Sequence, residues 1–134
     1  MTEQDQPERG WIQIPSRSSV AATADRLESL LKAHGILVFA RIDFSADAAR
    51  AGLSMPQEQL IIFGNPRAGT ALMVAAPTAG LDLPLKALIW EDGSGATWIA
   101  YNDPTYIVRR HGLPLALSEN LAAAAALIER AAGQ

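Results

Sequence analysis

The sequence predicts an α+β or α/β two-layer sandwich, in which helices pack against a mixed sheet of about five strands that includes one β-hairpin. Short apolar runs alternate along the chain with segments whose apolar residues recur at helical spacing. An Asp-Gly-Ser-Gly turn at residues 92–95 separates two strand-like runs, which is a strong hairpin signal. Apolar residues make up 49% of the 134 positions, enough for one core.

The predicted elements follow the order β-α-β-α-β-α-β-β-α-α. Strands are expected at residues 11–14, 36–42, 60–63, 83–91 and 96–101. Helices are expected at about residues 20–34, 45–51, 67–75, 104–111 and from 118 onward. Because helices separate most of the strands, we expect some parallel pairing beside the antiparallel hairpin.

The ends of the predicted helices carry capping signals. Ser18 or Ser19 offers a side-chain oxygen to the first helix, and Ser45 offers one to the second. Gly35 ends the first helix, because glycine adopts the left-handed cap conformation at low cost. The last helix is rich in alanine, and its apolar residues share one face: Leu121, Ala124, Leu127, Ile128 and Ala131.

We expect one domain at residues 10–134 after a disordered arm at residues 1–9, since no linker-like segment divides the chain. The first nine residues lack the pattern of a secretory leader. No apolar run approaches the ~20 residues that a membrane span needs. These features favour a bacterial cytoplasmic protein without a membrane partner.

Composition excludes several classes of function. The 11 basic and 14 acidic residues give a net charge of −3, so a nucleic-acid partner is not expected. The absence of cysteine removes disulfides and thiolate chemistry, and two histidines cannot by themselves form a structural zinc site. No phosphate-binding loop, dinucleotide glycine motif or nucleophile elbow is present. We therefore expect no metal and no cofactor.

Two strand-to-helix turns share one design. Phe63-Gly64-Asn65-Pro66 and Tyr101-Asn102-Asp103-Pro104 each place a capping residue before a proline that begins a helix. In open α/β sheets ligands bind beyond the carboxyl ends of strands, where helix N-termini also attract anions. The alternative is ordinary helix capping without a ligand. The candidate ligand-binding residues are Asn65, Arg67, Thr70, Lys86, Tyr101, Asn102 and Asp103.

Lys86 is unusual because it shares a strand face with Leu88 and Trp90. It either extends along the sheet edge, pairs with an acidic group, or lines a pocket for an acidic ligand. Trp90, Trp98 and Tyr101 are candidates for an aromatic cluster in the core or at a dimer surface.

Both histidines directly precede glycine at a predicted helix end. There a histidine interacts favourably with the helix dipole, which is the simpler interpretation of His34 and His111. His111 is also the one candidate catalytic residue, as a general acid or base that Asp103 or Tyr101 would orient.

An ordered string of motifs resembles the family called domain of unknown function 302, over about residues 10–130. The motifs are residues 60–66, 69–73, 80–86, 98–104 and 111–113. The resemblance implies the two-layer α/β fold of that family and a homodimer, and it implies no activity. The resemblance also implies that many members of the family have a histidine after an Ile-Asp pair. Here Phe44 follows Ile42-Asp43, so a role of that histidine would not be shared.

Three hypotheses follow. The first is a homodimeric module that binds or senses a small polar or anionic ligand at the two turns. The second is an enzyme that uses His111 on a small polar substrate. The third is an interaction protein whose alanine-rich last helix and tryptophans form a subunit interface.

Overall fold

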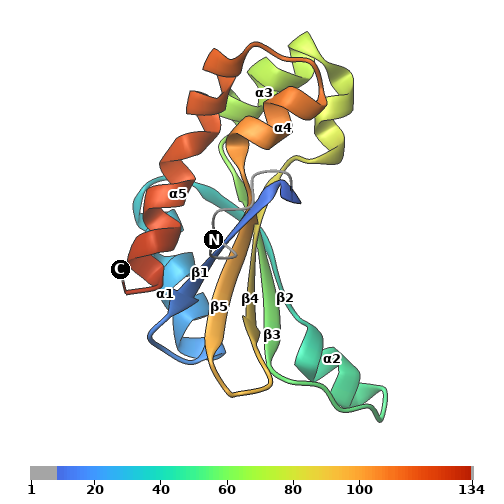
Figure 1. The fold of residues 1–134 in the computed structure, drawn as a ribbon, viewed down its shortest axis with the longest axis vertical. Coiled ribbons are helices and arrows are strands. Elements are labelled where there is room, and N and C mark those ends of the chain that lie inside the picture. The colour runs from blue at the N-terminus through green and yellow to red at the C-terminus, as the bar shows by residue number, and fades with distance from the viewer. Residues whose placement is uncertain (1–8, 134) are drawn as a thin grey trace.

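The computed structural model describes residues 9–133, which form a five-stranded antiparallel sheet with helices packed against it (Figure 1). The predicted α+β fold class is thus confirmed, and the strand order across the sheet is β1-β5-β4-β3-β2. The arm predicted at residues 1–9 lies outside the described residues, apart from Arg9. The strands are β1 (Trp11–Ser16), β2 (Leu37–Asp43), β3 (Glu58–Gly64), β4 (Leu85–Glu91) and β5 (Thr97–Asn102). The helices are α1 (Val20–Ala33), α2 (Phe44–Arg50), α3 (Pro66–Ala75), η3 (Pro77–Leu81), α4 (Pro104–Arg110), η4 (Leu115–Ser118) and α5 (Glu119–Ala131).

The sheet is antiparallel throughout, which corrects the prediction of a mixed sheet. A parallel pair requires a connection that crosses the sheet face and returns to the same end. The short helix α2 and the α3–η3 unit instead reverse the chain, so that β2, β3 and β4 are sequential antiparallel neighbours. Among the connections between the described strands, only the one through α1 crosses the sheet, and it joins β1 and β2 at opposite edges.

The main core lies between one face of the sheet and the helices α1 and α5 (Figure 1). Alternate strand residues point to this face, as the period of two requires. The sheet contributes Ile61, Phe63, Ala87, Ile89 and Ile99. The helices contribute Leu27, Leu31, Ala124, Leu127 and Ile128, which confirms the predicted buried face of the last helix.

A second cluster lies at one end of the sheet, where α3, η3 and α4 gather at the top of Figure 1. Its buried members are Leu72, Ala79, Ile107, Val108 and Leu121. Leu85 of β4 packs against both clusters, so the end helices and the main core are continuous.

One of the predicted helix caps needs correction. Ser19 caps α1 as expected, since its side chain accepts a hydrogen bond from the Ala22 amide. The cap of α2 is Asp43 rather than Ser45, and the Ser45 hydroxyl donates to the Asp43 carboxylate. Ser118 ends η4 and makes no side-chain cap to α5. Spacing alone could not separate adjacent capping residues, because the choice depends on the backbone direction at the strand end.

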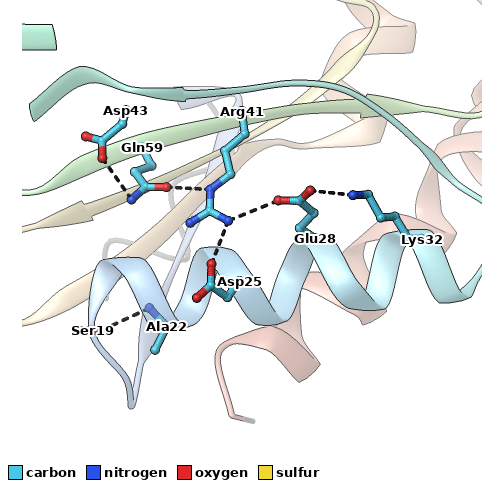
Figure 2. A network of polar contacts seen from close by, with 8 residues as sticks. All are labelled: Ser19, Ala22, Asp25, Glu28, Lys32, Arg41, Asp43 and Gln59. Atoms are coloured by element: carbon cyan, nitrogen blue, oxygen red, sulfur yellow. Dashed lines mark hydrogen bonds and ion pairs between the residues drawn. The ribbon is translucent and has the colours of Figure 1, made fainter. Parts of the chain in front are cut away.

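A polar network joins α1 to the edge strand β2 (Figure 2). The guanidinium of Arg41 donates to Asp25 at 2.8 Å, to Glu28 at 3.1 Å and to the buried Gln59 at 2.8 Å. Hydrogen bonds from Lys32 and Arg41 lower the pKa of Glu28 below its ordinary value. The network holds a helix surface against a strand that has only one neighbour in the sheet.

The second face of the sheet carries a stacked pair of tryptophans. The rings of Trp90 and Trp98 have centroids 6.4 Å apart. Tyr101 is buried on the opposite face, among the residues of the main core. The predicted three-residue aromatic cluster is therefore wrong for Tyr101, because residues 98 and 101 differ by an odd number along one strand.

Candidate ligand groove

The two strand-to-helix turns lie at the same end of the sheet. β3 and β5 are both antiparallel to β4, so they run parallel to each other with one strand between them. Their carboxyl ends therefore lie at the same end of the sheet, and α3 and α4 both begin there (Figure 1). This confirms the prediction that the two strand-to-helix turns lie at one end of the sheet, although the sheet is antiparallel.

At the strand-to-helix turn of residues 63–66, every backbone amide in the first helical turn of α3 has a hydrogen-bond partner. The Asn65 side chain accepts from the amide of Arg67, and the Asn65 carbonyl accepts from the amides of Ala68 and Gly69. Pro66 has no N–H. The helix dipole remains, but an anion would find no free backbone donor in this turn, contrary to the predicted anion site.

The second turn carries its own anion. The Asp103 carboxylate accepts from the amide and the hydroxyl of Thr105, both within 2.9 Å. A negative charge already occupies the beginning of α4, so this turn is a capped helix end.

A large concave surface opens beside the first turn. We call it the strand-end groove. Its volume is about 710 Å³, within the ~300–1,000 Å³ typical of small-molecule sites. Its main apolar lining consists of Phe39, Phe63, Met73, Leu83, Leu85, Leu121 and Leu127. Its polar lining consists of His34, Asn65, Thr70, Asn120 and Arg130. The groove thus joins the end of α1, the strands β2, β3 and β4, and the helices α3 and α5.

The predicted ligand-binding residues are divided between two cavities and the outer surface. Asn65 and Thr70 line the strand-end groove. Lys86, Tyr101 and Asn102 line a cavity of about 10 Å³, which is room for about one water molecule. The two cavities share the lining residues Phe63, Leu85, Leu121 and Ala124. Arg67 and Asp103 line neither cavity.

Lys86 and Tyr101 have different surroundings in the smaller cavity. The Lys86 ammonium donates to the Pro84 carbonyl at 3.1 Å, and within residues 9–133 it forms no salt bridge. Burial, followed by the charges of Glu129 and Asp103, raises the pKa of Tyr101. The phenol therefore stays protonated at neutral pH and can donate a hydrogen bond.

His111 lies away from both cavities, in a side-chain cluster of its own. Its side chain is only 5% exposed. Nε2 lies 2.6 Å from Asp82 and Nδ1 lies 2.9 Å from the Thr78 hydroxyl, while Arg110 also binds Asp82. The orienting carboxylate is Asp82 of the η3 turn, which corrects the predicted partners Asp103 and Tyr101.

Three polar groove residues were absent from the predicted site: His34, Asn120 and Arg130. They come from the end of α1 and from α5, which are far from the strand-end turns in sequence. The one signal in the sequence was the charge of Arg130 beside the apolar face of the last helix. Such a charge is typical of any surface helix, so it does not by itself indicate a site.

No group of three or more His, Asp or Glu side chains within the described part of the chain could hold a metal ion. None of the helices described is long and apolar enough to cross a membrane.

Comparison with known proteins places the chain in a family. The model of the "Domain of unknown function DUF302" matches residues 12–131. The chain belongs to this DUF302 family. A crystal structure titled as an uncharacterised conserved DUF302 protein from Bacillus stearothermophilus has the same fold, with a TM-score of 0.75 at 21% identity. The match covers 92% of this chain and 96% of that one.

Curated relatives of this DUF302 chain are longer proteins. It is 50% identical over 106 residues to proteins named "Fluoride-specific ion channel FluC 1" from Brucella suis and from Brucella abortus. The match covers 79% of this chain, but 42% of the Brucella suis protein and 39% of the Brucella abortus protein. The chain thus spans about two fifths of the relatives that it matches.

Proposed function

We propose that this DUF302 chain is a small-ligand-binding module whose site is the strand-end groove. The observation that carries the proposal is a wide cavity with an apolar floor and a few polar groups at its rim. Phe39 and Met73 are 53% and 39% exposed there, so a ligand would cover apolar surface that now faces solvent.

The lining of the groove favours a ligand other than fluoride, the ion in the names of the Brucella relatives. Fluoride is a small, strongly hydrated anion, and removing its water requires several hydrogen-bond donors. The groove offers mostly carbon surface and a volume suited to a larger molecule. The fluoride-channel activity in that name therefore does not enter the proposal.

A fluorescence titration with the neutral apolar dye phenylnaphthylamine tests the groove. Replacing Ala123, which lines the groove, with Trp should fill the cavity and weaken dye binding at least tenfold. Ala122→Trp is the matched control, because Ala122 is the adjacent exposed residue of α5 and lies outside the lining. Equal binding by the wild type and both variants would refute the proposed site.

The homodimer implied by the family resemblance is proposed at the second face of the sheet. Support comes from the half-buried apolar residues there, which alternate with the buried core positions: Leu60, Ile62, Leu88, Trp90 and Trp98. Aromatic and aliphatic residues of this kind are enriched at the centres of interfaces. A second copy of the chain would cover both tryptophans.

Light scattering during size-exclusion chromatography tests the dimer. The wild type should have twice the mass of the Leu88→Lys variant, while Val74→Lys, at an exposed position of α3, should leave the mass unchanged. Circular dichroism of each variant checks folding. A wild-type monomer at micromolar concentration would contradict the dimer and leave the groove proposal intact.

The enzyme alternative has weaker support. His111 does lie between a hydroxyl and a carboxylate, as a general base would. However, both of its ring nitrogens are engaged, and it lines neither of the two cavities described above. The cytoplasmic location and the absence of a nucleic-acid partner stay predictions from the sequence.

A further inference from the structure

We propose that the ligand of the strand-end groove is an amphiphile, with an apolar body and one anionic group that binds beside Arg130. This inference rests on the proposed function and names the chemistry of its ligand. Among the described residues that line the groove, His34 and Arg130 are the only ionisable ones, and none carries a carboxylate. The chain as a whole carries more acidic than basic residues, 14 against 11, so a groove without carboxylates favours an anion.

Arg130 is the residue best placed to hold the anion. Within residues 9–133 its guanidinium makes no hydrogen bond or ion pair, whereas those of Arg26, Arg41 and Arg110 all have acceptors. A guanidinium in a partly apolar setting binds carboxylate, sulfonate or phosphate oxygens in a fork geometry. Arg130 is available for such a partner.

The direction of the side chain places this charge at the groove. Side chains of an α-helix tilt toward the helix N-terminus, so Arg130 extends over the preceding turn of α5. Ala123, Ala126 and Leu127 of that region also line the groove. The anionic group would thus lie along α5, and the apolar body would reach toward Phe39 and Met73 on the other walls.

His34 adds a second polar contact on the α1 side. Its Nδ1 lies 2.9 Å from the Leu30 carbonyl, which can only accept, so Nδ1 carries the proton. Nε2 has no partner within residues 9–133 and remains for the ligand. The groove therefore offers one permanent cation and one imidazole nitrogen beside an apolar floor.

A matched pair of dyes tests the charge preference. Anilinonaphthalene sulfonate has the ring system of phenylnaphthylamine with a sulfonate added. We expect the sulfonate dye to bind the wild type about tenfold more tightly than the neutral dye, and we expect added salt to reduce that difference. Arg130→Gln should remove the difference by weakening the sulfonate dye alone. Arg130→Lys, which keeps the charge, should retain most of it.

Arg109→Gln is the control, because Arg109 is an exposed arginine of α4 outside the groove. It should leave both dyes unaffected. Equal affinity of the wild type for the two dyes, or an Arg130→Gln variant that weakens both equally, would overturn the anionic ligand while the groove remains. If Ala123→Trp left the affinities of both dyes unchanged, the groove would not be the binding site. Thermal denaturation of each variant checks that these exposed substitutions leave the fold intact.

Discussion

At the scale of single residues, the polar side chains of this DUF302 protein mostly hold structure together. His111 shows this best, since it joins the end of α4 to Thr78 and Asp82 of the η3 region. The sequence places His111 before a helix-ending glycine, but its carboxylate partner lies 29 positions away. Only folding of α3 and η3 over the sheet end brings the two together.

The cluster around His111 predicts a loss of stability on substitution. His111→Ala should reduce the free energy of unfolding by about 1–3 kcal/mol, because Asp82 and Thr78 would lose a buried partner. Urea denaturation of His111→Ala, Asp82→Ala and the double variant measures it. The double variant should lose less than the sum of the two single losses. Strict additivity would show that the two side chains act independently.

Asp92 predicts a dependence of stability on pH. Hydrogen bonds from Trp98 and Ser94 lower the pKa of this carboxyl well below its ordinary value of 3.8. A group with a depressed folded-state pKa stabilises the protein above its unfolded pKa and loses that effect as pH falls toward the folded value. The melting temperature of wild type should thus exceed that of Asp92→Asn at neutral pH.

The difference between wild type and Asp92→Asn should narrow as the pH falls below about 3.8. Melting curves at several pH values from neutral to strongly acidic would show the trend. A difference that stayed constant over that whole range would mean that the charge of Asp92 contributes nothing to stability.

At the scale of elements, the Arg41 network attaches α1 to an edge strand. Arg41→Met should lower the free energy of unfolding by about 1–2 kcal/mol, because Asp25, Glu28 and Gln59 lose a common donor. Arg50→Met is the matched control: Arg50 is exposed and, within residues 9–133, pairs only with Asp47 on α2, so its loss should cost less than about 0.5 kcal/mol. Equal effects in urea denaturation would contradict a specific role of the network.

Gly69 offers a stabilising change within α3. A methyl group added there would lie 3.8 Å from Leu83 and 3.9 Å from Met73, which are ordinary contacts. Gly69→Ala should therefore raise the free energy of unfolding by about 0.5–1 kcal/mol through helix propensity. Gly112→Ala should do the opposite, because its φ is +66°. Thermal denaturation decides both, and a destabilised Gly69→Ala would mean that the helix is strained near the groove.

At the scale of the whole molecule, Leu85 links the main core to the cluster beneath the end helices. We therefore expect a single unfolding transition. Leu27→Ala, at a fully buried position of α1, should cost about 2–5 kcal/mol. Leu115→Ala, at a position 52% exposed, should cost less than about 0.5 kcal/mol. Two separate transitions by fluorescence and circular dichroism would show that the end helices unfold independently.

Local patterns alone determined the order of elements, the β4–β5 hairpin, the buried face of α5 and the caps at Asn65 and Asp103. These features depend on neighbours a few residues apart, so periodicity and capping chemistry suffice to predict them. The ordered string of motifs between residues 60 and 113 also sufficed to predict the family.

Tertiary structure alone decided the direction of the strands and the composition of the groove. Antiparallel pairing followed from α2 and the α3–η3 unit reversing the chain, which no local pattern encodes. His34, Phe39 and Arg130 meet at one cavity because α1 and α5 pack on the same sheet face. Contacts between distant segments depend on how every element packs at once, and for this reason the polar rim could not be predicted from spacing along the chain.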